Sequence, residues 1–410
     1  MIYSTFDGRK GSKEVFSEPL QISKLAFGAM RLPLLADGKS IDADTTFRMV
    51  DQAMAAGVNY YDTAYPYHGG LSEVVLCNAL RRYPRDSYFL ADKYPGHQTA
   101  DTYDPAAVFE DQLKKCGVDY FDFYLLHNVT ESCIDVYLSD RWKIVDYFVE
   151  QRRKGRIRHL GFSSHASLPT LKRWLESPQG KEMEFCQIQL NYVDWTLQQA
   201  KEKCALLAAY GLPIWVMEPV RGGKLATLPD DLTARLRAQR PDESTAAWAF
   251  RWLQTVPDVT VVLSGMSSPE QMNDNLKTFS TERPLTEAEV SLLQDEVASR
   301  LNKGIPCTAC RYCCDGCPME LDIPQLLSTL NDLRFENSLT PSMYIESLPD
   351  DKKPTACLSC GACADACPQG IAIPDLIQEL NERMEKAPKW SEICKERNEI
   401  ARRLANGIDA

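Results

Sequence analysis

The sequence predicts an α/β protein in which a closed parallel barrel of eight strands, a (β/α)8 or TIM barrel, is followed by a small helical domain. Two observations lead to this prediction. A short apolar run, a loop and an amphipathic helical stretch alternate eight times in the first three quarters of the 410 residues, as in barrels of this class. Ten of the 15 cysteines lie after residue 300, eight of them in two tight runs. We therefore place the barrel over residues 1–300, a cysteine-rich domain over 301–385 and a C-terminal helix over 386–410.

The predicted strands are short runs rich in β-branched and aromatic residues. They cover residues 25–30, 58–62, 88–93, 121–127, 159–163, 185–190, 214–218 and 259–264. Several of the helical stretches between them end in glycine, as at Gly57 and Gly117, which suits the left-handed residue that closes many helices. An open, doubly wound sheet is the alternative. That fold would be expected to carry a GxGxxG turn after its first strand, and the sequence contains none.

Composition excludes several classes of protein. With 44% hydrophobic and 25% charged residues and a mean hydropathy of −0.32, the chain reads neither as disordered nor as a membrane protein. A net charge of −11 argues against a nucleic-acid-binding surface. The N-terminus lacks the basic start and apolar stretch of a signal peptide. We expect a cytoplasmic protein that binds neither nucleic acid nor a membrane.

Titratable residues end three successive predicted strands: Asp62, Lys93 and His127. Active sites of such barrels lie at the C-terminal ends of the strands, so the three residues together point to one catalytic mouth. Tyr65 and Tyr67 follow Asp62 closely. A buried lysine beside a tyrosine lowers the phenol pKa toward the working range, and a carboxylate keeps that lysine charged. A histidine across the pocket can orient a carbonyl oxygen.

The stretch NYYDTAYPYHGGLSE around Asp62 resembles the signature of the aldo/keto reductase family, in which an aspartate is followed five residues later by the catalytic tyrosine. The resemblance selects Tyr67 rather than Tyr65. Lys93 in YFLADK and His127 in DFYLLHN match the family's lysine and histidine. The mechanism it implies is hydride delivery from a nicotinamide to a carbonyl carbon, with Tyr67 as proton donor. Lys93 would tune Tyr67, Asp62 would hold Lys93, and His127 would orient a small-molecule carbonyl or alcohol substrate.

The resemblance also implies a set of dinucleotide contacts. These are Gly28, Ser163, Ser164, Gln189, Met217, Gly222, Gly223, Lys224, Ser264, Gln271 and Asn275. Ser163-Ser164 replaces the family's Ser-Asn pair, and Met217 replaces its ring-stacking tyrosine. Gln271 replaces the arginine that meets the 2′-phosphate, and a phosphate without a basic partner binds less tightly. Both NADP(H) and NAD(H) are therefore expected candidates, and nothing indicates a flavin, although a barrel mouth has room for one.

Two cysteine runs dominate the last part of the chain. Both follow the pattern C-x2-C-x2-C-x3-C-P, which is typical of bacterial two-cluster ferredoxins, whose fourth cysteine ligates the other cluster. We assign one [4Fe–4S] cluster to Cys307, Cys310, Cys313 and Cys367. We assign the other to Cys357, Cys360, Cys363 and Cys317. Zinc is the alternative, but zinc sites seldom use three cysteines stepped this closely. Cys314 is out of register and is expected to be a bystander.

Each run is followed by a similar helix start, LDIPQLLSTLNDL and IAIPDLIQELNER, with proline in the first turn. This internal duplication predicts an α-helical ferredoxin-like domain.

Three functions fit a barrel joined to such a domain. In the first, the barrel is a nicotinamide-dependent carbonyl reductase whose clusters exchange electrons with an external ferredoxin or flavoprotein, or with the substrate itself. In the second, the barrel is a reductase whose clusters are structural or redox-sensing. In the third, the chain is an electron-transfer protein whose barrel is a cofactor-binding or docking platform. We favour the first, because a platform has no evident need for the four polar residues at the mouth.

Overall fold

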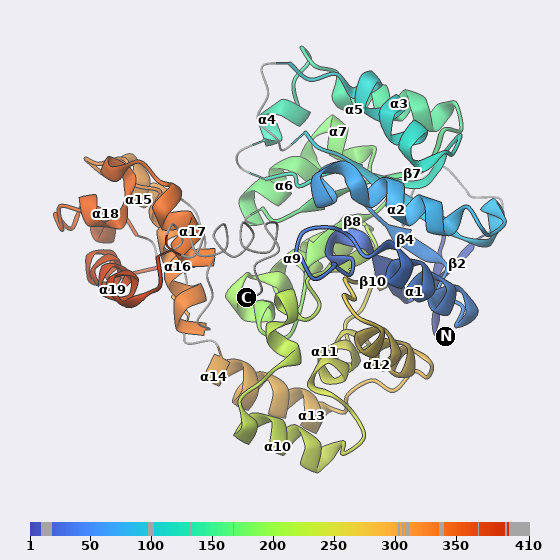
Figure 1. The fold of residues 1–410 in the computed structure, drawn as a ribbon. Coiled ribbons are helices and arrows are strands. Elements are labelled where there is room, and N and C mark those ends of the chain that lie inside the picture. The colour runs from blue at the N-terminus through green and yellow to red at the C-terminus, as the bar shows by residue number, and fades with distance from the viewer. Residues whose placement is uncertain are drawn as a thin grey trace, which may run out of the picture. The chain divides into compact units, whose positions relative to one another are not determined.

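The computed structural model describes residues 1–9, 19–96, 102–130, 133–166, 168–301, 304–305, 307, 311–335, 340–367, 369–389 and 392. The chain divides into two compact units, Met1–Asp295 and Glu296–Ala410, close to the boundary expected near residue 300 (Figure 1). Over the described ranges, no helix combines the length and the hydrophobicity needed to cross a membrane.

The first unit is a closed barrel of eight parallel strands, as predicted. The strands are β3 (Leu25–Gly28), β4 (Tyr60–Asp62), β5 (Phe89–Tyr94), β6 (Phe121–Leu126), β7 (Ile157–Ser164), β8 (Cys186–Gln189), β9 (Ile214–Met217) and β10 (Val259–Ser264). They follow one another around the barrel in chain order, and β10 pairs with β3, as in Leu263 opposite Ala26. This last pairing closes the sheet and rules out the open doubly wound arrangement.

An N-terminal hairpin, which the sequence did not predict, covers one end of the barrel. Its strands β1 (Tyr3–Phe6) and β2 (Leu20–Ser23) pair antiparallel. The Phe6 ring packs at 5.6 Å from Phe123 and 5.2 Å from Trp215, between ring centroids, inside the barrel. Because β2 leads directly into β3, this plug lies at the N-terminal ends of the strands. The C-terminal ends are left for a site.

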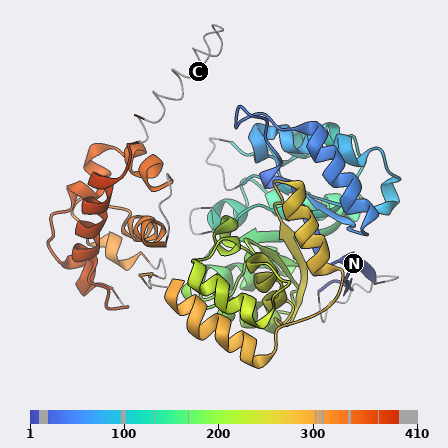
Figure 2. The same ribbon diagram turned by 60° about the horizontal axis from the view of Figure 1, so that its bottom comes forward.

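Helices surround the strands (Figures 1 and 2). The longer ones are α1 (Ala43–Ala55), α2 (Leu71–Leu80), α3 (Pro105–Cys116), α5 (Ile144–Arg153), α6 (Leu168–Glu176), α9 (Ala200–Ala209), α10 (Asp230–Gln239), α11 (Thr245–Leu253) and α12 (Pro269–Phe279). The shorter ones are α4 (Ile134–Tyr137), α7 (Pro178–Lys181), α8 (Asp194–Leu197) and α13 (Glu287–Ser291). A π-helical turn at Leu292–Ala298 then crosses the boundary into the second unit, which begins with α14 (Ser299–Leu301). Side-chain caps begin several of them; Asp42, for example, accepts a hydrogen bond from the Thr45 N–H at 2.9 Å.

The second unit is helical throughout its described residues and reflects the duplication in the sequence. Its other helices are α15 (Tyr312–Asp315), α16 (Ile323–Phe335), α17 (Thr340–Ser347), α18 (Ala362–Asp365) and α19 (Ile373–Lys386). The short helices α15 and α18 pack together, as do the long helices α16 and α19, around a core that includes the buried Leu330 and Leu380. The helix expected over 386–410 falls almost entirely outside the described residues.

Candidate functional site

A buried ion pair forms the floor of the site at the C-terminal ends of β4 and β5. The parallel register sets Asp62 opposite Ala91, so Lys93, two residues further along β5, faces the same mouth. Its ammonium Nζ donates to Asp62 Oδ1 at 2.5 Å and to the Thr63 carbonyl at 2.6 Å, and its side chain is fully buried. Burial, the largest single influence, lowers the pKa of Lys93, but the charge and hydrogen bond of Asp62 together with Tyr67 and Asp92 outweigh it and leave the pKa raised. Lys93 is therefore held as a cation.

Tyr67 and His127 converge above this pair. Lys93 Nζ lies 5.0 Å from the centroid of the Tyr67 ring, and the His127 ring meets that ring edge-on at 5.7 Å. Tyr65 turns elsewhere, with Lys115 Nζ 4.0 Å from its ring centroid. The structure thus brings together all four residues expected at the mouth and separates Tyr67 from its neighbour.

The pKa of Tyr67 differs from the sequence-based expectation. Burial raises it, and the opposing charge of Lys93 does not bring it below the ordinary phenol value. The sequence-based expectation of a lowered pKa took into account the charge of the lysine but not the loss of solvent around the phenol. Tyr67 consequently carries its proton at neutral pH, which suits a proton donor.

Local backbone geometry fixes the two aromatic side chains. Tyr67 begins a short turn (Tyr67–Gly70) in which three successive residues, His68, Gly69 and Gly70, have positive φ angles of 50°, 64° and 87°, a conformation that favours glycine. The His68 ring accepts a hydrogen bond from the Leu32 N–H at 3.2 Å. His127, just beyond β6, is held through its backbone, since its carbonyl accepts from the Tyr137 hydroxyl at 2.7 Å.

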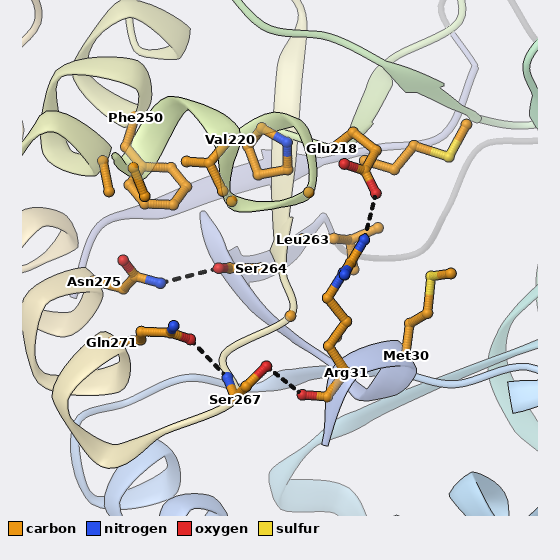
Figure 3. Close-up of a pocket in the computed structure, with 18 of the residues that line it drawn as sticks. Met30, Arg31, Glu218, Val220, Phe250, Leu263, Ser264, Ser267, Gln271 and Asn275 are labelled. Atoms are coloured by element: carbon orange, nitrogen blue, oxygen red, sulfur yellow. Dashed lines mark hydrogen bonds and ion pairs between the residues drawn. The ribbon is translucent and has the colours of Figure 1, made fainter. Parts of the chain in front are cut away.

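A pocket of about 450 Å³ opens beside Asp62 and Tyr67 and extends to the loop between β10 and α12. Seven of the expected dinucleotide contacts line it: Gly28, Met217, Gly222, Gly223, Ser264, Gln271 and Asn275. Asn275 Nδ2 donates to Ser264 Oγ at 3.0 Å, which joins α12 to the end of β10 (Figure 3).

Four other expected contacts are placed away from the pocket lining. The Ser163 hydroxyl accepts from the Asn128 N–H at 2.8 Å, and the Ser164 hydroxyl donates to the Val129 carbonyl at 2.7 Å. Both serines therefore support the loop after β6. Gln189 Nε2 donates to Asp194 Oδ2 at 2.7 Å. Lys224 belongs to a short turn, Arg221–Ala226, and is not among the lining residues of the pocket.

Gln187 is the glutamine that faces the pocket. Its Nε2 lies 3.7 Å from the Met217 sulfur, and its buried Oε1 has no hydrogen-bond partner among the described residues. The alternation of a strand puts Gln187 and Gln189 on the same face, so the sequence pattern alone does not choose between them. The difference comes from Asp194, the first residue of α8, which accepts the hydrogen bond of Gln189.

Four other charged residues of the pocket were not predicted from the sequence: Arg31, Glu218, Glu270 and Asp274. Arg31 is the one cation among its described lining residues, and its guanidinium lies 3.7 Å from Glu218 Oε1 on the opposite wall (Figure 3). Glu270 and Asp274 line the far end. Glu218 directly follows β9, so the rule that located Asp62, a polar residue at the end of a strand, would have located it too.

The second unit gathers cysteines from both runs. Cys317 of the first run lines one cavity together with Cys357, Cys360 and Cys363 of the second, the crossed set that the spacing predicts. The Ser359 N–H donates to Cys357 Sγ at 3.4 Å. Among the described residues no three acidic, histidine or cysteine side chains converge tightly enough for one metal ion; the four cysteines line a cavity together with apolar side chains.

The remaining predicted ligands are only partly described. Cys313 is buried; burial and the neighbouring Cys314 and Cys307 raise the pKa of its thiol to about 12, which places Cys307 near it. Cys310 lies outside the described residues. Cys367, at the end of the second run, donates its N–H to the Ala364 carbonyl at 3.1 Å.

Comparisons with known proteins agree with this division. The model of the aldo/keto reductase family matches residues 24–297, and that of a 4Fe-4S dicluster domain matches residues 306–372. An uncharacterised oxidoreductase of Bacillus subtilis is 24% identical over 323 residues, covering 71% of this chain and 98% of that protein. An NADPH-dependent alpha-keto amide reductase of Saccharomyces cerevisiae is 27% identical, covering 63% of this chain and 82% of that protein. An NADH-specific methylglyoxal reductase of Escherichia coli is 22% identical, covering 64% of this chain and 90% of that protein.

Solved structures show the same fold. An aldo-keto reductase from Bacillus halodurans in its holo form superposes with a TM-score of 0.56 at 25% identity, over 72% of this chain and 96% of that one. An aldo-keto reductase from Klebsiella pneumoniae in complex with NADPH gives a TM-score of 0.56 at 18% identity, over 72% of this chain and 95% of that one.

Proposed function

Because this chain belongs to the aldo/keto reductase family, an oxidoreductase family, we propose that its barrel reduces the carbonyl group of a small molecule, or oxidises the corresponding alcohol. The cofactor would be a nicotinamide dinucleotide, NADP(H) or NAD(H). The observation that carries the proposal is the buried Lys93–Asp62 pair beneath Tyr67, on the wall of a pocket of about 450 Å³. Two relatives named above for reducing carbonyl compounds with such a cofactor support it.

The residues present fit a dinucleotide. Gln187 offers a buried amide oxygen with no partner among the described residues, which suits the carboxamide N–H of a nicotinamide, and Met217 lies beside it. Arg31, the one cation of the described lining, suits the diphosphate. Ser264 and Asn275 would lie toward the adenosine.

When bound, the nicotinamide supplies a hydride to the carbonyl carbon. Tyr67 holds a proton, because burial keeps its pKa high, and gives it to the carbonyl oxygen as negative charge develops there. The cation of Lys93 stabilises the phenolate that remains, and Asp62 holds Lys93 charged and in place. His127, across the ring of Tyr67, orients the substrate oxygen by hydrogen bonding.

For the second unit we propose two [4Fe–4S] clusters with the crossed ligand sets given above. The shared cavity of Cys317 and the second run supports this assignment, because it brings the fourth cysteine of the first run to the first three of the second, as the crossed pattern requires. A cluster moves one electron at a time, whereas hydride carries two. We therefore propose that the clusters exchange electrons with an external ferredoxin or flavoprotein rather than directly with the nicotinamide.

The test uses the full chain with its clusters reconstituted anaerobically to about eight irons. NADH or NADPH is added first, then a panel of small aldehydes and α-dicarbonyl compounds. We expect nicotinamide absorbance to fall only after a carbonyl compound is added, while the visible absorbance of the clusters and their low-temperature EPR spectrum stay unchanged. Bleaching of the clusters by the nicotinamide alone would contradict the separation of the two electron paths. No oxidation of either nicotinamide with any carbonyl compound would contradict the reductase proposal.

A further inference from the structure

We propose that the far end of the pocket selects a dinucleotide whose adenosine ribose carries a free 2′-hydroxyl, NAD(H), and rejects one that carries a 2′-phosphate. This inference rests on the proposed function, since it requires that the pocket bind a dinucleotide. It is drawn from the charges of this chain's own side chains at the end of the pocket remote from Tyr67.

Two carboxylates occupy that end. Glu270 lies in the first turn of α12, and Asp274 lies four residues later, on the same face of the helix; both line the pocket. Asp274 Oδ2 accepts a hydrogen bond from the hydroxyl of Ser244, another lining residue, at 2.5 Å. Hydrogen bonds from Ser268 and from its own backbone N–H hold the pKa of Glu270 below its ordinary value. Both side chains therefore meet an incoming ribose as acceptors.

Side chains of the chain itself already bond backbone N–H groups at the start of α12. The first N–H groups of a helix commonly bind phosphate. Here Ser268 Oγ accepts from the Gln271 N–H at 3.4 Å, and Gln271 Oε1 accepts from the Ser267 N–H at 2.8 Å (Figure 3). Gln271 therefore folds back onto its own loop. A phosphate placed here would meet the carboxylate of Glu270, while the one guanidinium of the described lining, Arg31, pairs with Glu218 instead.

The described lining also offers no cation at this end of the pocket to offset the added charge. Its described lining includes four carboxylates, Asp62, Glu218, Glu270 and Asp274, and one guanidinium, Arg31. Figure 3 shows Arg31 directed toward Glu218 rather than toward Gln271 and Asn275. A phosphate monoester brings a further charge of about −1.5 to −2 at neutral pH. A ribose hydroxyl can instead donate a hydrogen bond to a carboxylate, the arrangement by which other dinucleotide sites recognise NAD.

Two fragments without a nicotinamide ring test this end of the pocket alone. ADP-ribose and 2′-phospho-ADP-ribose are titrated calorimetrically into the cluster-loaded full chain. We expect ADP-ribose to bind at least about tenfold more tightly. Raising the salt concentration should reduce the difference between the two affinities, because salt screens the repulsion between the 2′-phosphate and the carboxylates. Tighter binding of the 2′-phosphate fragment would overturn this inference and leave the proposed function intact. Failure of both fragments to bind would overturn the dinucleotide site itself.

A variant pair assigns the effect to the two carboxylates. In the Glu270→Gln/Asp274→Asn variant, the affinities for ADP-ribose and 2′-phospho-ADP-ribose should differ by no more than about threefold, mainly because the 2′-phosphate fragment binds more tightly. Glu287→Gln removes an exposed carboxylate from the first turn of α13, outside the pocket, and should leave the ratio of the two affinities unchanged. An unchanged ratio in the double variant would overturn the assignment. The ratio measured in the unaltered chain tests the selectivity even if that variant folds poorly.

Discussion

A Tyr67→Phe variant is expected to lose carbonyl reduction by a factor of about 10²–10⁴, the usual contribution of a positioned proton donor, while binding the dinucleotide as the unaltered chain does. Only the phenol oxygen is removed, and the ring that packs against His127 at 5.7 Å is kept. The measurement is the single-turnover rate of nicotinamide oxidation with a carbonyl substrate, together with the affinity for the dinucleotide.

Tyr65→Phe is the matched control. That tyrosine lies two residues earlier and faces Lys115 at 4.0 Å rather than Lys93, so its loss should leave the rate within about twofold. Equal rates for Tyr67→Phe and Tyr65→Phe would remove Tyr67 from its proposed role. A Tyr67→Phe variant that no longer binds the dinucleotide would place Tyr67 in binding rather than in proton transfer.

The second large effect concerns the crossed cluster ligands. If Cys317 and Cys363 bind the same cluster, as their shared cavity indicates, a Cys317→Ser/Cys363→Ser variant loses that cluster alone and keeps about four of about eight irons. If each run binds its own cluster, the same variant damages both and keeps almost none. Iron and sulfide analysis after anaerobic reconstitution separates the two outcomes.

Two controls accompany this measurement. Cys314→Ser removes a thiol next to the first run that is out of register with the ligands, and it should keep about eight irons. Either single variant, Cys317→Ser or Cys363→Ser, should keep about four. Loss of all iron from a single variant would show that the two clusters do not assemble independently.

The barrel was predictable because its strands are buried on both faces and appear as apolar runs. The hairpin of β1 and β2 was not, since two four-residue strands outside the repeating unit give little periodic signal. The helical pairs of the second unit followed from the duplicated segments that begin after Cys317 and Cys367.

The site was predictable where a residue's position along a strand decides its role, as for Asp62, Lys93 and His127. The site was not predictable where contacts from another helix or strand determine which way a side chain points. Asp194 draws Gln189 away, so that Gln187 faces the pocket. The pKa of Tyr67 depends on how much solvent the fold removes, and a lysine identified in the sequence says nothing about that.

Hydride transfer from the nicotinamide to the substrate in the barrel can be followed by isotope labelling. NADH and NADPH, each deuterated at the transferring position of C4, are supplied in separate reactions to the cluster-loaded full chain with a small α-dicarbonyl substrate, and the product is analysed by mass spectrometry. We expect one deuterium on the carbon that was the carbonyl carbon. A reduced product without deuterium, formed while the nicotinamide is oxidised, would show that the electrons travel through the clusters and the proton comes from water, and would contradict hydride transfer in the barrel.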